Sequence, residues 1–158
     1  MMSATPISLK ARALRLLSGR EHSRAELERK LASHEVEPGS LGRALDELAS
    51  RGFIDEQRVL DSVVHRRAAK FGAARIRQEL QGKGLDPEAV RAALAELGNT
   101  ELDRAREVWR HRFAQAPADA AAYAKQVRFL LSRGFATETV RRVVSHPTGD
   151  AADPDAPE

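Results

Sequence analysis

The sequence predicts an all-α protein in which three tandem three-helix repeats stack into an elongated, curved array. Alanine, leucine, arginine and glutamate dominate and aromatic residues make up only 4% of the chain, a composition that favours helices over sheets. Apolar residues recur at intervals of three and four, without an alternating strand pattern or an Asn-Gly hairpin turn. The helical pattern also returns after a fixed interval, which is typical of stacked repeats.

The repeat is clearest between the first and second units, where apolar or proline positions recur 49 residues later without a gap. The pairs are Leu27 with Ile76, Leu31 with Leu80, Val36 with Leu85, Pro38 with Pro87, Leu41 with Val90, Leu45 with Leu94 and Leu48 with Leu97. An offset of 50 relates the second unit to the third less regularly, because Ile76 falls on Gln126. The predicted parts are a flexible N-terminus at 1–8, repeats at 9–53, 54–98 and 99–145, and a disordered acidic tail at 146–158.

In the first repeat, leucines at three- and four-residue spacing give each predicted helix one apolar face. These helices are predicted at 7–18, from 23 to about 33 and from 41 to about 52. Gly19 ends the first helix, and Ser23 with Glu26 has the spacing of a capping box that opens the second. Pro38 and Gly39 mark the turn before the third helix.

The second repeat has the most regular start and stop signals. Its helices are predicted from 55 to about 70, at 75–81 and at 87–97. Asp55 can cap the first of them, and Gly82 with Gly84 closes the second. Asp86 can accept hydrogen bonds from the first N–H groups of the third helix, where Pro87 fits the opening turn.

The third repeat follows the same order of elements. Its helices are predicted at 101–113, 118–133 and 137–144. Pro117 separates the first two, and Gly134 ends the second. Trp109, Phe113 and Phe129 lie among apolar residues at helical spacing, so core packing is favoured over stacking on nucleic-acid bases.

Composition limits the classes of function. The chain has no cysteine, so it has no disulfide and no thiolate zinc site, which is compatible with a reducing cytoplasm. No apolar run approaches the roughly 20 residues of a membrane helix. Lys10, Arg12 and Arg15 also interrupt the segment where a signal peptide would have its apolar core. We therefore expect a cytoplasmic protein without a membrane segment.

The basic residues are unevenly distributed. The formal net charge of +3 includes four acidic residues after Arg142, where lysine and arginine are absent, so the rest of the chain is more basic than the total. The four are Asp150, Asp153, Asp155 and Glu158. An arginine-rich body favours an anionic partner, such as nucleic acid or an acidic protein surface, although it also fits an ordinary soluble helical protein.

The densest basic run lies in the second repeat, where six lysines or arginines between positions 62 and 84 accompany a single acidic residue, Glu79. Residues spaced by four within this run, Arg58, Ser62, Arg66 and Lys70, predict one polar stripe along a helix. The candidate partner-binding residues are Arg58, Arg66, Arg67, Lys70, Arg75, Arg77 and Lys83, with Arg128 and Arg133 beside the turn of the third repeat. A second patch, diluted by glutamates, comprises Arg12, Arg15, Arg20, Arg24, Arg29 and Lys30. An ordinary solvated helix face is the alternative for both patches.

No arrangement typical of catalysis or of a cofactor site is present. The Gly82-Lys83-Gly84 sequence lacks the long glycine-rich loop and the following Ser or Thr of a phosphate-binding loop. The five histidines include no pair spaced by four, which disfavours a metal site. We therefore expect a protein that is not an enzyme and needs no metal or cofactor.

Four sequence blocks resemble motifs of the RecX family of bacterial recombination regulators. Residues 20–27, REHSRAEL, resemble a block of the family's first unit, and residues 51–56, RGFIDE, resemble its inter-unit segment. Residues 72–85 resemble the second-unit signature, with the pattern G-x-x-R-I-x-x-E-L-x-x-K-G-L, and residues 128–135, RFLLSRGF, resemble a third-unit block. The resemblance covers about residues 9–144. The chain departs from the family pattern at His34-Glu35 and Val59-Leu60, which changes one helix end and core packing without removing a candidate contact.

The resemblance implies a regulator that binds the RecA recombinase filament on single-stranded DNA and lies in the groove of that filament. It further implies inhibition of strand exchange, ATP turnover and coprotease activity, and so a role in DNA repair, recombination and the SOS response. We expect a monomer with at most weak affinity for free DNA.

Two other classes of function remain open. Three short helices with a glycine-containing turn are compatible with direct helix-turn-helix recognition of DNA, although the helix at 87–97 offers only Arg91 as a long basic contact. A passive helical scaffold would bind neither DNA nor the filament.

Overall fold

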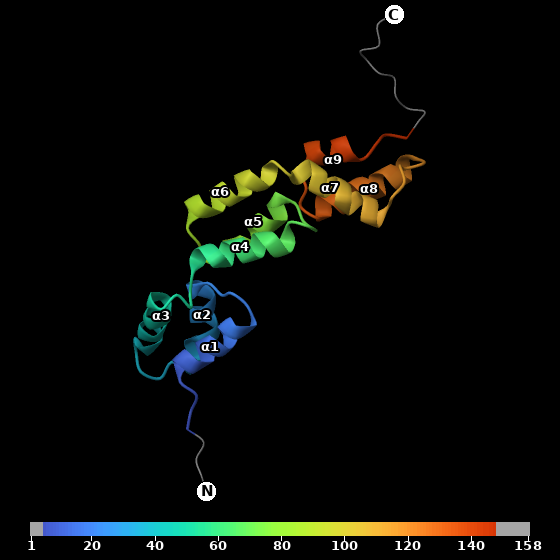
Figure 1. The fold of residues 1–158 in the computed structure, drawn as a ribbon. Coiled ribbons are helices and arrows are strands. Elements are labelled where there is room, and N and C mark those ends of the chain that lie inside the picture. Colours follow the sequence, from blue (N-terminus) through green and yellow to red (C-terminus); the bar gives the residue numbers. More distant parts are fainter. Residues whose placement is uncertain (1–4, 148–158) are drawn as a thin grey trace, which may run out of the picture. The chain divides into compact units, whose positions relative to one another are not determined.

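The computed structural model describes residues 5–147, which form a chain of helices joined by short turns (Figure 1). The helices are α1 (Leu9–Gly19), α2 (Arg24–Leu31), α3 (Ser40–Ser50), α4 (Glu56–Arg67), α5 (Ala73–Gln81), α6 (Pro87–Gly98), α7 (Glu101–Arg112), α8 (Ala120–Ser132) and α9 (Thr137–Val143), with a 3₁₀ helix, η1 (Ala32–His34), after α2. No strand occurs within residues 5–147, and the predicted all-α class is confirmed. The start of the expected flexible N-terminus, residues 1–4, and nearly all of the expected acidic tail, residues 148–158, lie outside the described residues.

The described residues divide into two compact units. Unit 1 contains residues 5–65 and 78–93, and unit 2 contains residues 66–77 and 94–147. The division passes through α4, α5 and α6, so the second repeat contributes residues to both units.

In unit 1, α1 packs against α2 and α3 around an apolar core. The core residues are Ala13, Leu27, Leu31, Leu41, Leu45, Leu48 and Ile54. The predicted capping box is present: the Ser23 hydroxyl accepts from the Glu26 N–H at 3.2 Å, and the Glu26 carboxylate accepts from the Ser23 N–H at 3.3 Å. Helix α1 begins two residues later than predicted because the Ser8 hydroxyl caps it, accepting from the Ala11 N–H at 3.1 Å.

One position of the repeat differs between the units. Val36 aligns with Phe135 through the repeat, but the Val36 side chain is 95% exposed whereas that of Phe135 is 3% exposed. In unit 1 a carboxylate closes this turn: Glu35 accepts from the N–H groups of Gly39 at 2.9 Å and Leu41 at 3.2 Å. The turn therefore does not depend on burying Val36.

In unit 2, α7, α8 and α9 lie side by side around a second core (Figure 1). Its buried residues are Ala105, Leu130, Phe135, Val140 and Val144. Trp109 and Phe129 pack against this core, as predicted, and both keep part of their surface accessible. Helix α8 begins two residues after its predicted start because the Asp119 carboxylate caps it, accepting from the Ala122 N–H at 2.7 Å.

The irregular position of the third repeat has a polar function. Gln126, which aligns with Ile76, is 6% exposed. Its side-chain oxygen accepts from the indole N–H of Trp109 at 2.8 Å, and its amide group donates to the Gln115 carbonyl at 3.1 Å. Both polar ends of the buried amide are thereby satisfied.

Candidate functional site

Two turns of unit 2 contact each other through the backbone at Gly72 and Gly134. This contact brings together basic residues that are far apart in the sequence. The Gly72 N–H, between α4 and α5, donates to the Arg133 carbonyl at 2.8 Å, and the Ala74 N–H donates to the Gly134 carbonyl at 3.3 Å. A Cβ atom on Gly72 would lie 2.3 Å from the Gly134 oxygen, and one on Gly134, whose φ is +88°, would lie 2.6 Å from Arg75. Both positions therefore require glycine, and their contact sets the α5 start against the α8 end.

Two charged residues near the start of α7 fix the same turn. The Arg104 guanidinium donates to the carbonyls of Ala68 at 2.8 Å and Phe71 at 2.7 Å, and so binds carbonyls that follow the last turn of α4. Burial lowers the pKa of Arg104, while Glu101 acts in the opposite direction. The Glu101 carboxylate accepts from the Ala73 N–H at 3.0 Å. The turn that carries Phe71 is thus held from two sides.

The Phe71 ring is surrounded by arginines from three elements of unit 2. The guanidinium carbons of Arg67, Arg75 and Arg133 lie 5.5, 5.2 and 5.3 Å from the ring centroid. These are cation–π distances, at which the ring face attracts the positive charge. The Arg75 guanidinium also donates to the Ser132 carbonyl at 3.2 Å, which holds it beside α8.

A second group of rings continues the surface. Arg133 lies 5.0 Å and Arg112 lies 5.5 Å from the Phe129 ring centroid, and Arg112 lies 5.3 Å from that of Phe113. The two phenyl rings meet edge to face with centroids 5.4 Å apart. We call the whole set the cationic site; it comprises Arg67, Lys70, Phe71, Arg75, Arg112, Phe113, Phe129 and Arg133.

Part of the cationic site is an open hollow of about 490 Å³. Its lining residues are Ala69, Lys70, Val108, His111, Arg112, Phe129 and Arg133. The lining combines the apolar side chains of Ala69, Val108 and Phe129 with three basic side chains, a combination that suits an anionic group attached to a flat or apolar body.

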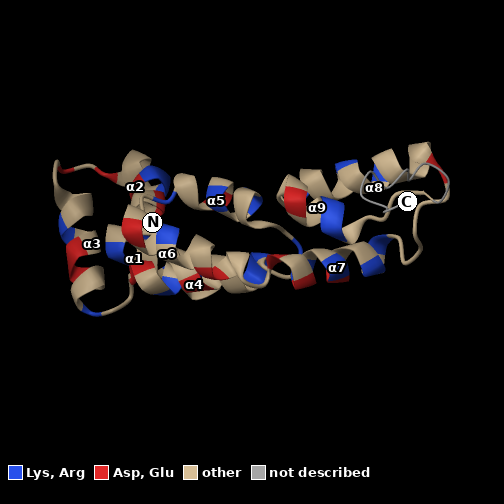
Figure 2. Ribbon diagram, turned by 90° about the horizontal axis from the view of Figure 1, so that it is seen from above, with Lys and Arg blue, Asp and Glu red and all other residues tan. Residues whose placement is uncertain are grey.

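Three arginines of unit 2 outside the site pair with carboxylates of their own helices, whereas four cations of the site have no carboxylate partner among the described residues. Acidic and basic residues are mixed along α7 (Figure 2), where Asp103 pairs with Arg106 at 3.6 Å and Glu107 pairs with Arg110. Within the described part of the chain, no carboxylate forms an ion pair with Lys70, Arg75, Arg112 or Arg133. The site therefore carries positive charge that its own unit does not neutralise.

The structure brings together four of the nine predicted contact residues. Arg67, Lys70, Arg75 and Arg133 belong to the cationic site, and Arg66, Arg77 and Arg128 are exposed without joining the ring contacts described above. The predicted stripe does not reach Lys70 as a helix face, because α4 ends at Arg67.

Arg58 has a different environment, in unit 1. Its guanidinium pairs with Glu21 at 3.0 Å and with Asp55 at 3.5 Å. In the second patch, Arg20 pairs with Glu26 at 2.7 Å and Arg24 pairs with Asp46 at 2.7 Å. These cations have acidic partners within their own unit, unlike those of the cationic site.

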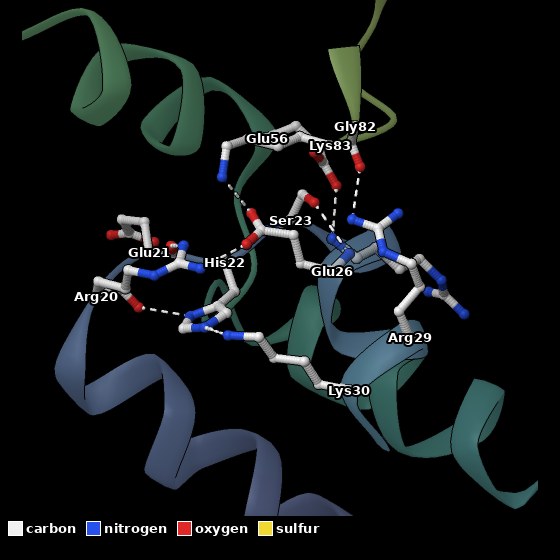
Figure 3. A network of polar contacts seen from close by, with 11 residues as sticks. Arg20, Glu21, His22, Ser23, Glu26, Arg29, Lys30, Glu56, Gly82 and Lys83 are labelled. Carbon is white, nitrogen blue, oxygen red and sulfur yellow. Dashed lines mark hydrogen bonds and ion pairs between the residues drawn. The ribbon is translucent and has the colours of Figure 1, made fainter. Parts of the chain in front are cut away.

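Lys83 is a buried structural residue of unit 1. Its side chain is 10% exposed, and its ammonium group lies 2.9 Å from the Glu26 carboxylate, which also receives the Arg20 guanidinium (Figure 3). Burial would raise the pKa of Glu26, but hydrogen bonds from Arg20, Lys83 and the Ser23 backbone outweigh it and lower the pKa to about 2. Lys83 therefore joins the α5–α6 turn to α2 and does not belong to the basic surface.

His22 completes this network. Its Nδ1 lies 3.0 Å from the Arg20 carbonyl and its Nε2 lies 3.1 Å from the Lys30 ammonium (Figure 3). Burial lowers the pKa of His22, and the hydrogen bond to the carbonyl opposes this effect. A neutral ring with its proton on Nδ1 satisfies both contacts, because Nδ1 then donates and Nε2 accepts.

Sequence reasoning missed Arg112, Arg104 and Phe71. Arg112 is the last residue of α7, a helix rich in both signs of charge, and Phe71 carries no charge to mark it as part of a basic patch. The sequence did contain a signal for two of them, because a basic residue directly precedes a phenylalanine in Lys70-Phe71 and in Arg112-Phe113. Arg104 left no local signal, since its carbonyl partners belong to another repeat.

The described residues form neither a metal site nor a membrane-spanning helix. Among residues 5–147, no cluster of histidine and acidic side chains could hold a metal ion. The described helices are also too short or too polar to cross a membrane.

Comparisons with known proteins identify the family. Sequence models described as the first, second and third three-helix domains of RecX match residues 10–48, 55–94 and 99–144. The chain is 56% identical over 138 residues to the regulatory protein RecX of Leptothrix cholodnii, covering 87% of this chain and 88% of that protein. It is 45% identical over 152 residues to that of Ralstonia nicotianae, covering 96% of each. The crystal structure of RecX from Lactobacillus salivarius, 20% identical, has the same fold with a TM-score of 0.69 over 85% of this chain and 91% of that one. The chain belongs to the RecX family.

Proposed function

We propose that the protein binds the RecA recombinase filament on single-stranded DNA and inhibits its recombinase, ATPase and coprotease activities. It would thereby modulate DNA repair, recombination and the SOS response from the cytoplasm, acting as a monomer. Membership of a family whose relatives are named regulatory proteins supports a regulatory role. The match to all three of the family's three-helix domains supports the same role.

The observation that carries the proposal is the cationic site. Lys70, Arg112 and Arg133 line one hollow without a carboxylate partner among the described residues. Nucleic acid presents a regular row of phosphates, and a protein that contacts them displaces counterions and gains affinity. Phe113 and Phe129, beside these cations, are only partly buried and leave apolar ring surface for contact with unstacked bases. The site therefore fits a single-stranded phosphate chain better than an isolated anion.

The first experiment measures ATP hydrolysis by the host RecA on single-stranded DNA, with this protein added below the RecA concentration. Inhibition at substoichiometric amounts is the expected result, because a regulator that acts on a filament affects many subunits at once. RecA that hydrolyses ATP at its full rate at every ratio would overturn the proposal.

A site variant and a matched control then test the cationic site. Lys70→Gln, Arg112→Gln and Arg133→Gln together should abolish inhibition and reduce the slope of log affinity for single-stranded DNA against log salt by about 2, at roughly 0.7 per lost phosphate contact. The control removes three charges of unit 2 that are paired with carboxylates: Arg106→Gln, Arg110→Gln and Arg141→Gln. Circular dichroism checks that both variants stay folded. Equal losses in the two variants would show that net charge, not the site, determines binding.

Direct reading of duplex DNA has less support. Two long basic residues on the helices after the turns have acidic partners: Arg91 pairs with Glu88 at 2.6 Å, and Arg141 pairs with Glu138 at 3.0 Å. A base-reading helix needs such side chains for the groove. Affinity for naked duplex equal to that for the filament, with loss on specific base changes, would favour this alternative.

We also expect the protein to act without catalysis. Its relatives carry the name of a regulator rather than of an enzyme. ATP hydrolysis by the purified protein alone, retained through further purification, would contradict this expectation.

A further inference from the structure

The acidic segment, residues 148–158, follows unit 2 directly. It contains Asp150, Asp153, Asp155 and Glu158 and no lysine or arginine. We propose that this segment docks on the cationic site of its own chain and competes there with nucleic-acid phosphate. The docking is independent of any partner, whereas the competition depends on the proposed function.

Charge complementarity is the first argument for this occupant. Lys70, Arg75, Arg112 and Arg133 lie together at one site and have no carboxylate partner among the described residues. Three arginines of unit 2 outside the site, Arg106, Arg110 and Arg141, pair with carboxylates of their own helices. The acidic segment has the opposite imbalance, with four carboxylates and no cation. Arginine binds carboxylate through two parallel N–H donors, so the guanidinium groups of Arg112 and Arg133 suit this partner.

The place where the segment begins is the second argument. The His146 ring stacks on the Tyr123 ring with centroids 4.4 Å apart, and the two side chains also approach within 3.4 Å. This contact fixes the end of the described chain beside the first turn of α8. From Tyr123, Phe129 and Arg133 lie six and ten residues further along the helix, or about 9 and 15 Å at 1.5 Å per residue.

The length of the segment matches these distances. An extended chain spans at most about 3.6 Å per residue, so Asp150 reaches about 14 Å and Asp153 about 25 Å from His146. The carboxylates can therefore bend around α8 to the hollow without straining the chain. A tether this short gives the segment a high effective concentration at the site.

The energetics fit a reversible competitor. Exposed ion pairs are individually weak and are screened by salt, so the docked segment should exchange readily. A phosphate chain makes several contacts at once and releases counterions, and it can therefore displace the segment. The docked acidic segment would therefore compete successfully against weakly bound or short anions and would be displaced only by a longer phosphate chain.

The docking is tested on the full chain without nucleic acid. A water-soluble carbodiimide at low salt joins lysine ammonium groups to nearby carboxylates as amides, which peptide mass spectrometry locates. We expect the acidic segment to form cross-links to Lys70 in preference to Lys125, which is exposed on α8 only two residues from Tyr123. The Lys70→Arg variant keeps the charge and should lose only the Lys70 product. Cross-links from the acidic segment that favour Lys125, or that are spread equally over Lys10 and Lys125, would overturn docking.

The competition is tested with a tail in which charges are neutralised. Asp150→Asn, Asp153→Asn, Asp155→Asn and Glu158→Gln together should tighten binding to single-stranded DNA several-fold at low salt, and the gain should vanish as salt rises. The same four changes in the background of Lys70→Gln, Arg112→Gln and Arg133→Gln should have no effect. An equal gain in both backgrounds would overturn competition at the site, because it would reflect net charge alone.

The two proposals can fail separately. Preferred joins to Lys70 in a protein that does not inhibit RecA would leave docking intact and refute the proposed function. Inhibition of RecA by a protein whose acidic segment shows neither the Lys70 preference nor the site-dependent gain would refute this inference alone.

Discussion

At the scale of single residues, two lysines of one basic run have opposite environments. Lys70 lines the hollow of the cationic site, whereas Lys83 is buried against Glu26. The sequence pattern grouped them because it records charge and spacing within one repeat. The partner of Lys83 belongs to another repeat, so the local pattern could not reveal its burial.

Removing the buried partner should destabilise the fold. Lys83→Met leaves the Glu26 carboxylate with Arg20 and the Ser23 backbone as its charged and polar partners, and we expect a loss of about 2 kcal/mol. Arg91→Met is the matched control, because it removes one cation of an exposed ion pair and should cost less than about 0.5 kcal/mol. Urea unfolding followed by circular dichroism measures both. Equal midpoints for the two variants would show that the Lys83 contact is not buried in solution.

The Glu26 pKa predicts a pH dependence with a definite sign. The pKa falls from 4.5 to about 2 on folding, so the folded state favours the charged carboxylate. This contribution to stability is fully present above pH 4.5 and is lost as the pH falls through about 2. The difference in urea midpoint between the wild type and Glu26→Gln should therefore shrink across this range. Titrating groups that do not interact with Glu26 are present in both proteins and cancel; a difference independent of pH would contradict the assignment.

At the scale of elements, three helix caps were predicted correctly, whereas the Ser8 and Asp119 caps and the contact between turns were not. The box of Ser23 and Glu26 and the Asp55 and Asp86 caps involve residues two or three positions apart, and all are present. The approach of Gly72 to Gly134 depends on two turns from different repeats. The sequence indicated a helix end at Gly134 and the start of a family-like block at Gly72, and nothing in either local pattern indicated that the two glycines touch.

The same contact gives a sharp prediction. In Gly72→Ala the new methyl group would lie 2.3 Å from the Gly134 oxygen, so the two backbones must separate, at a cost of about 2 kcal/mol or more. Phe71 and Arg75 would move away from Arg133, and affinity for single-stranded DNA should fall with stability. Gly98→Ala is the control: no atom lies within 4 Å of its added Cβ, and it should change stability by less than about 1 kcal/mol. Unfolding midpoints and DNA titrations compare the two; a Gly72→Ala protein as stable as the control would refute the close approach.

At the scale of the whole molecule, sequence period and packing divide the chain differently. The period predicts three repeats, and the family's domains follow the same order. The compact units instead divide the second repeat, assigning residues 66–77 to unit 2 and residues 78–93 to unit 1. Periodicity could not predict this, because it compares residues along the chain, whereas Arg104 and Gly134 bind the α4–α5 turn across the boundary between repeats.

A truncated chain tests whether this division reflects stability. A protein of residues 1–98 keeps two complete repeats but lacks Glu101, Arg104 and Gly134, which hold the α4–α5 turn. Its amides near residues 72–76 should lose their protection against hydrogen exchange, whereas α1 to α3, with their own core, should keep theirs. Exchange measured by mass spectrometry on the truncated and full chains compares the two regions directly. Protection that is unchanged near residues 72–76 would mean that the second repeat is stable without the third, because it would then hold its turn through its own contacts.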